Sequence, residues 1–374
     1  MPRHARPHSE GPTARHADAR APSPRPRGHA QAQAHAHAHA HAHARAPRLR
    51  HTASVLGAHV IAVLAIVLVG FALPRTMPGD PLAALGGADA DLGIDPQARE
   101  EALAFYGLDQ PLGTQLVDHL TGLLHGDLGW SLAHGVPVAE LLAQHLPWTF
   151  GLAGLALLLS SVLALVAGAA AAWWRGRPLD RALVSVLTGL RAIPEYVVAS
   201  ALLIAFAVVV PVLPTAGGQS AFVSHPHLAA ALADLARHGA LPLAALTVSL
   251  LGGSFLVVRG SVARELDSEH LALARAKGLP PRLLAGRHAA RGALIPFLAG
   301  VGVRASLAVG GAVFVEAVFS YPGMGLLILD AVEARDHPVL EGAFLVLALS
   351  VLVVNGVVEI VADRLDPRGE AKAA

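Results

Sequence analysis

The clearest cluster of functional side chains in this sequence is a short basic run, followed by two prolines and a histidine: Ala274, Arg275, Ala276, Lys277, Gly278, Leu279, Pro280, Pro281 and His288. Arg275 and Lys277 would complement the dipole at the C-terminus of a short helix, and Gly278 could end that helix in the left-handed conformation. The prolines prevent the helix from resuming directly. The pattern predicts a helix, a tight turn and a second helix that could contact a soluble partner. On charge alone, a loop that binds anionic lipid headgroups is an alternative.

Charged residues inside apolar stretches form a second group. A charge at the centre of a bilayer costs about 2.5 to 3.5 kcal/mol, so such residues usually face an interior path or a partner. Arg304 and Glu316 are twelve positions apart, roughly 18 Å along one helix, and cannot pair directly. We take both as candidates for a translocation path, with Glu316 near the outer surface. Arg191 and Glu195 are four positions apart, which predicts a local ion pair on one helix face.

Five histidines alternate with alanine in the N-terminal part of the chain, at His35, His37, His39, His41 and His43. Neutral imidazoles could bind a divalent metal loosely, although a low-complexity repeat without function is the favoured interpretation. Residues 1–51 have no apolar run and cannot bury enough surface to offset chain entropy. We therefore expect a disordered tail, followed by an uncleaved first membrane span.

Several catalytic constellations are missing from the sequence. Cysteine is absent, which excludes disulfides and thiolate metal sites. A phosphate-binding Walker loop needs Gly-Lys before Ser or Thr, and neither lysine, Lys277 or Lys372, fits that pattern. Neither a His-Glu-x-x-His zinc pattern nor a Gly-x-Ser-x-Gly nucleophile elbow is found. We expect no enzyme activity, no cofactor and no nucleic-acid partner, so energy for any transport must come from another protein.

The elements that position these residues follow from hydropathy. The mean hydropathy is +0.52, with 54% apolar and 15% charged residues, which predicts an all-α polytopic membrane protein. Six apolar stretches are long enough to cross a bilayer: Val55–Leu73, Thr149–Ala172, Ala182–Val212, Ala240–Val258, Ala293–Val318 and Gly342–Ala362. Pro194 is expected to kink the third span without ending it. The glycine pairs Gly252-Gly253 and Gly310-Gly311 predict close helix packing.

The distribution of Lys and Arg predicts the orientation. The N-terminal tail, the loops at 173–181 and 259–291, and the segment after residue 362 hold 22 of the 28 basic residues, against four on the other side. Segments rich in basic residues stay cytoplasmic, so both termini and the 259–291 loop are predicted to be cytoplasmic. Residues 74–147 form an extracytoplasmic segment, in which Asp95 and Pro96 predict the start of a short helix.

A specific resemblance rests on motifs spread along the chain. These are Pro78-Gly79-Asp80-Pro81, Tyr106-Gly107-Leu108-Asp109-Gln110-Pro111, Gly126-Asp127-Leu128-Gly129 with Ser131, Pro137-Val138, Leu146-Pro147, Ala274-Arg275-Ala276-Lys277-Gly278, His288 with Pro296, Val318-Phe319-Ser320-Tyr321-Pro322-Gly323-Met324-Gly325, Arg335-Asp336-His337-Pro338 and Leu365-Asp366-Pro367-Arg368. In order and spacing, the chain resembles permeases of binding-protein-dependent ABC transporters, in particular the dipeptide, oligopeptide and nickel branch. The resemblance covers residues 54–369. Ala272 stands where the wider family has a glutamate.

The resemblance implies a six-helix importer permease over residues 54–369, in the bacterial inner membrane. It also implies that the 259–291 loop is a coupling helix that docks on an ATPase subunit. The implied partners are ABC ATPase subunits, a second homologous permease, an extracytoplasmic substrate-binding protein and the lipid bilayer. The solute would be a peptide or a related small solute, with nickel as another option. An ATPase-independent channel or secondary carrier is the alternative; paired midplane carboxylates and internal repeats, which that alternative would favour, are not found. An intramembrane enzyme and a scaffold are weaker alternatives.

Overall fold

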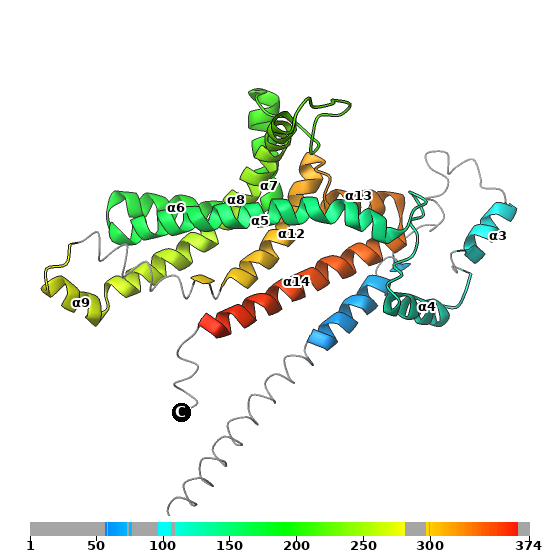
Figure 1. Cartoon of the computed structure of the whole chain (residues 1–374), viewed down its shortest axis with the longest axis horizontal. Helices are drawn as coiled ribbons and strands as arrows, with labels where there is room; N and C mark the ends of the chain where they lie inside the picture. The colour runs from blue at the N-terminus through cyan, green and yellow to red at the C-terminus, as the bar shows by residue number, and fades with distance from the viewer. Residues whose placement is uncertain are drawn as a thin grey trace, which may run out of the picture. The chain divides into compact units, whose positions relative to one another are not determined.

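The computed structural model describes residues 57, 59–72, 75–76, 96–105, 109–280, 297–298 and 300–365. Of residues 359–365 it describes the helix but not the side chains. The histidine-rich tail and His288 therefore lie outside the described residues, as do residues 281–296, where the second helix of the 259–291 loop was predicted. The regular structure of the described part is helical (Figure 1). Its elements are the helix His59–Ala72, α3 (Pro96–Phe105), α4 (Leu112–Leu124), α5 (Val138–Trp173), α6 (Pro178–Arg191), α7 (Glu195–Leu203), the π-helix η2 (Ile204–Val209), α8 (Leu228–Leu266), α9 (Glu269–Ala276), α12 (Val301–Phe319), α13 (Met324–Ala334) and α14 (His337–Leu365).

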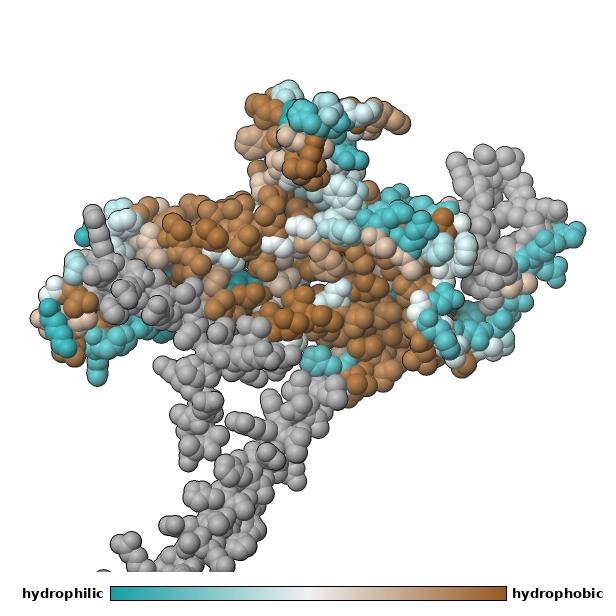
Figure 2. Space-filling view, viewed as in Figure 1, coloured by the Kyte–Doolittle hydropathy of each residue, from teal (hydrophilic) through white to brown (hydrophobic). Residues whose placement is uncertain are grey.

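Four of these helices are long and apolar enough to cross a membrane: α5, α8, α12 and the His337–Val358 part of α14. A fifth crossing is present if α6 and the α7–η2 segment count as one broken span, and His59–Ala72 is a shorter apolar helix. Hydrophobic side chains gather over α5, α12 and α14, whereas polar side chains gather around α4 and α9 (Figure 2). This distribution fits an apolar membrane-spanning belt with a polar region at each end.

The third predicted span is not a kinked helix, so that prediction was wrong. α6 ends at Arg191, α7 begins at Glu195, and the two helices are bent by 100° at the break. Proline has no backbone N–H and disfavours a helical conformation of the residue before it. Pro194 therefore precedes a new helix, with ψ at 146°, where a kink within one helix was expected.

The second, fourth, fifth and sixth apolar stretches overlap α5, α8, α12 and α14, but several helices are longer. α5 begins at Val138, before the predicted Thr149, and continues through Pro147. α8 has 39 residues and extends beyond both predicted ends. Soluble extensions of membrane helices carry polar residues that a hydropathy window leaves out. α3 begins at Pro96, which confirms the start predicted for this short helix.

Small residues allow the long helices to pack closely. A Cβ on Gly168 of α5 would lie 2.8 Å from Val258 of α8, and a Cβ on Gly252 of α8 would collide with the backbone of Leu187 in α6. Gly252 confirms the packing role predicted for the glycine pairs. Gly310, in contrast, has no neighbouring atom within 4 Å of an added Cβ. Small side chains at contacts between membrane helices let the backbones approach, which is the main source of packing energy in lipid.

Candidate functional site: a helix turn and two polar cavities

α9 is a short helix that follows directly from α8 and ends in a tight turn. Gly278 has a φ of +77°, and its N–H donates to the carbonyl of Arg275 at 3.0 Å. The N–H of Leu279 donates to the carbonyl of Ala274 at 3.2 Å, which closes the last turn. The predicted helix stop at Gly278 is thus confirmed. Figure 1 shows α9 at the end of α8, away from α4.

Most residues of α9 and the turn after it are exposed, and a buried apolar side chain anchors the helix. Ala272, Arg275, Ala276, Lys277 and Gly278 are exposed, and Ala274 and Leu279 are half-buried. Leu271 is fully buried among side chains of α5, α6 and α8. The Arg275 guanidinium donates to the carbonyl of Leu266, the last residue of α8, at 2.9 Å. The segment is therefore a surface feature that is fixed to the membrane helices at its base.

A buried ion pair ties α8 to α6 near this end. Asp180 is 3% exposed and accepts hydrogen bonds from Nε and Nη2 of Arg259 at 2.6 and 2.9 Å. The N–H of Gly176 donates to the same carboxylate at 2.9 Å. Sequence reasoning missed this pair, although a lone acid just before a predicted span, opposite a basic helix end, is a usable signal. The pair would carry a movement of α8 into α6, because charged bidentate contacts are strong and directional.

Arg304 lines a cavity of about 240 Å³ among α6, α7, α8 and α12. It is 8% exposed, its guanidinium carbon lies 4.2 Å from the centre of the Phe297 ring, and it donates to the Phe297 carbonyl. Its Nε is buried and has no hydrogen-bond partner. A cation therefore faces the interior of the membrane domain, as the sequence predicted, but with its donors only partly used.

Arg191 and Glu195 line the same cavity from the two sides of the break between α6 and α7. The predicted local ion pair is absent among the described contacts, because these residues lie on separate helices and not on one helix face. The Glu195 carboxylate approaches Gly311 of α12, where an added Cβ would lie 3.3 Å from Oε1. Sequence spacing alone did not indicate that Arg191, Glu195 and Arg304 would share one cavity.

Glu316 does not line this cavity. Its side chain is fully buried beside the start of α13, where Oε2 accepts a hydrogen bond from the Gly325 N–H at 2.7 Å. Oε1 has no partner, and a Cβ on Gly323 would collide with the carboxylate. The neighbouring Met324 N–H is bound by the Thr149 hydroxyl at 2.8 Å. Glu316 thus binds the N-terminus of α13, and the structure does not bring it together with Arg304.

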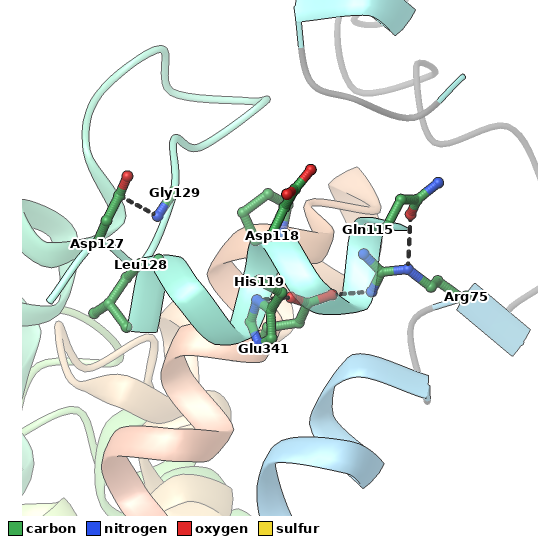
Figure 3. A pocket seen from close by; sticks show the side chains of 10 residues that line it. Arg75, Gln115, Asp118, His119, Asp127, Leu128, Gly129 and Glu341 are labelled. Atoms are coloured by element: carbon green, nitrogen blue, oxygen red, sulfur yellow. Dashed lines mark hydrogen bonds and ion pairs between the residues drawn. The ribbon is translucent and has the colours of Figure 1, made fainter. Parts of the chain in front are cut away.

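A second polar cavity, of about 200 Å³, lies where the first apolar helix, α4 and α14 meet (Figure 3). Arg75 pairs with Glu341 of α14 and donates to Gln115 of α4 at 3.2 Å. His119 Nδ1 lies 3.2 Å from Oε2 of Glu341. Burial, and then the neighbouring Arg75 guanidinium, lower the pKa of His119. The sequence reading did not single out this cluster, although Arg75 directly follows the first span.

Two of the motifs that carry the family resemblance meet beside this cavity. Asp336 is fully buried, and its Oδ2 accepts hydrogen bonds from the Ser131 hydroxyl at 2.5 Å and the Ala133 N–H at 3.0 Å. A Cβ on Gly129 would lie 3.6 Å from Pro338. The contact spans 205 positions of sequence, so these motifs form one structural unit. No group of acidic and histidine side chains in the described residues could hold a metal ion.

Comparison with known proteins gives a consistent family. Residues 164–370 match the family of binding-protein-dependent transport system inner membrane components. A probable peptide ABC transporter permease of Sinorhizobium fredii is 32% identical over 82% of this chain and 95% of its own length. A di/tripeptide transport system permease of Pseudomonas aeruginosa is 32% identical over 86% and 98%. A glutathione transport system permease of Escherichia coli is 29% identical over 82% and 93%.

The family match includes α6 to α14, and each of the three relatives matches more than four fifths of this chain. The family and the apolar helices together place the chain in the bacterial inner membrane as a multi-pass protein. The chain belongs to the binding-protein-dependent transport system inner membrane components, in the branch of dipeptide and oligopeptide ABC transporter permeases.

Proposed function

We propose that this chain is a permease subunit of an ABC importer that forms part of a translocation path for peptides or related small solutes. The observation that carries the proposal is α9, an exposed helix fixed at its base to α8 and stopped sharply at Gly278. Such an element can receive a push from a soluble ATPase and pass it to the membrane helices. The chain has no Walker loop of its own, so the ATPases are separate subunits.

The route of the movement within the chain is proposed to run from α9 through α8 to the rest of the domain. Leu271 and the Arg275 contact to Leu266 link α9 to α8. The Asp180–Arg259 pair then links α8 to α6, which ends at the cavity lined by Arg304. Alternating access needs such rigid connections between the driven element and the path. Residues Ala274 to Leu279 and His288 form the proposed coupling segment.

The proposed topology has six spans with both termini in the cytoplasm. The excess of basic residues at 173–181, 259–291 and beyond residue 362 supports this orientation. It places α9 in the cytoplasm, and α4 and the Arg75–Glu341 cavity outside. An extracytoplasmic substrate-binding protein would then dock over the outer segment, and a second homologous permease would complete the path. The relatives named as peptide, di/tripeptide and glutathione permeases support a peptide-like solute.

The test is a comparison of Gly278→Val with Gly126→Val. Both glycines have positive φ, +77° and +78°, and an added Cβ at either meets no atom within 4 Å. Valine therefore introduces similar backbone strain at both positions. We expect wild type and Gly126→Val to co-purify from host membranes with an ATPase, identified by mass spectrometry, and to support its activity. We expect Gly278→Val to lose the ATPase or its stimulation.

Two other outcomes would redirect the proposal. If no form of the chain binds an ATPase, an ATPase-independent channel or secondary carrier becomes the better explanation. If both variants lose the ATPase equally, general strain rather than the coupling segment explains the loss, and the role of Gly278 is rejected.

A further inference from the structure

The cavity of about 240 Å³ between α6, α7, α8 and α12 combines charges of both signs. Arg191 comes from the end of α6, Glu195 from the start of α7, and Arg304 from α12. The side chains that α8 contributes are uncharged, and include Ser249 and Ser254. The cavity is therefore a small polar chamber, with two cations and one carboxylate, inside an otherwise apolar helix bundle.

These charges are not satisfied by one another. Among the described contacts, neither Arg191 nor Glu195 forms an ion pair. Arg304 donates one hydrogen bond to the Phe297 carbonyl, and its Nε has no hydrogen-bond partner. An ionised side chain at membrane depth costs about 2.5 to 3.5 kcal/mol when nothing compensates it. Arg304 is such a residue, whereas Glu195 is half-buried and Arg191 is exposed. The convergence of these three side chains on one cavity points to a ligand that carries the complementary charges.

The helices make room for these side chains. Gly252 brings α6 against α8, because a Cβ there would collide with the Leu187 backbone and lie 3.0 Å from Cβ of Arg191. Gly311 leaves space for Glu195, whose Oε1 would lie 3.3 Å from an added Cβ. The 100° break at Pro194 turns Arg191 and Glu195 toward the same cavity from different helices. Gly252, Gly311 and the break at Pro194 therefore shape this cavity.

We infer that this cavity binds a short zwitterionic peptide, with Arg191 and Arg304 receiving the terminal carboxylate and Glu195 receiving the terminal ammonium group. This inference rests on the proposed importer function and names residues of its path. Guanidinium groups bind carboxylates with paired, charge-assisted hydrogen bonds. The volume is below the roughly 300 to 1000 Å³ of pockets for drug-sized ligands, which fits a di- or tripeptide.

The absence of cysteine from the chain allows a direct binding test. Ser249→Cys places one thiol in the cavity, and Thr121→Cys on the exposed face of α4 is the matched control. The complex purified with its partner subunits is treated with a maleimide, and mass spectrometry follows labelling of this chain. The probes are alanyl-alanine and its N-acetylated, C-amidated derivative. No substrate-binding protein is added, so its own selectivity does not enter.

We expect alanyl-alanine to slow labelling of Ser249→Cys about tenfold at a concentration tenfold above its dissociation constant. The blocked derivative should give no protection, and Thr121→Cys should label at one rate throughout. Adding Glu195→Gln or Arg304→Gln to Ser249→Cys should remove the protection by alanyl-alanine. Equal protection by both peptides, or protection that survives both substitutions, overturns the assignment of the charges.

ATP-dependent uptake of radiolabelled alanyl-alanine into proteoliposomes, with all subunits present, separates the two proposals. If uptake occurs but the peptide never protects Ser249→Cys, the cavity assignment fails and the importer function stands. If neither uptake nor a bound ATPase is found, the importer function fails and the cavity assignment fails with it.

Discussion

Two regions of the membrane domain hold charged side chains in opposite ways. At the Asp336 junction, defined by Ser131, Asp336 and the start of α14, the carboxylate of Asp336 accepts hydrogen bonds from donors of this chain. At the cavity between α6, α7, α8 and α12, Arg191, Glu195 and Arg304 lie around an open space without pairing with one another. Asp336 and Arg304 are both buried, but the charge of Asp336 is compensated within the chain and that of Arg304 only in part.

The difference distinguishes charged side chains that stabilise the fold from charged side chains that are available to bind a ligand. A buried carboxylate whose donors come from distant motifs fixes one arrangement of the helices, because any other arrangement leaves those donors unpaired. Charges without partners do not fix the fold. They persist where a ligand or another subunit completes them, and they lower the stability of the empty chain. Stability measurements can therefore distinguish the two regions without knowledge of the substrate.

The largest effect is expected for Asp336→Ala at the Asp336 junction. The substitution leaves the Ser131 hydroxyl and the Ala133 N–H buried without their acceptor. The expected loss is about 2 to 3 kcal/mol in free energy of unfolding, typical of hydrogen bonds to charged groups. Thermal unfolding of the detergent-solubilised chain, followed by gel filtration, measures it. Asp267→Ala is the control, because Asp267 is 69% exposed in its pair with Arg175 and should change stability little.

A smaller effect of opposite sign is expected for Glu195→Gln in the cavity. Its carboxylate has no partner in the described contacts, so removal of the charge should leave stability unchanged or raise it by about 1 kcal/mol. The same thermal assay measures this change, and peptide uptake should fall in parallel. Glu140→Gln at the exposed start of α5 is the control for loss of one carboxylate. A drop in stability as large as that of Asp336→Ala would show that Glu195 is structural.

The sequence predicted the long helices and the end of α9, but not which side chains meet in space. Hydropathy located the long helices, and the identity of Gly278 predicted the stop of α9, because both depend on local chain properties. The signature from Tyr321 to Gly325 was recognisable as a motif. Its physical reason became visible only in the structure, where a Cβ on Gly325 would collide with the backbone of Val313.

The candidate site required tertiary information. Arg304 was predicted as an interior charge from its position in an apolar stretch. Its neighbours Arg191 and Glu195 were assigned to one helix face, since four-residue spacing has that meaning only if the helix continues. The break at Pro194 overrides the spacing and turns both residues toward α12. Glu316 was grouped with Arg304 by charge alone, whereas the structure places it at the start of α13.

The smallest expected effect is a pH dependence at the Arg75–Glu341 cavity, where charged side chains pair with one another around an open space. His119 faces Arg75 and Glu341, and burial and Arg75 lower its pKa below the ordinary value of about 6.5. The folded chain therefore binds this proton less readily than the unfolded chain. The stability that depends on neutral His119 is present above about pH 6.5 and is lost as the pH falls through the lowered pKa.

We expect the thermal midpoint of wild type to fall more between pH 7 and pH 5 than that of His119→Gln. His125→Gln on the exposed end of α4 is the matched control and should follow wild type. Identical pH profiles for wild type and His119→Gln would mean that the histidine does not contribute, and that the Arg75–Glu341 pair holds this cavity together without it.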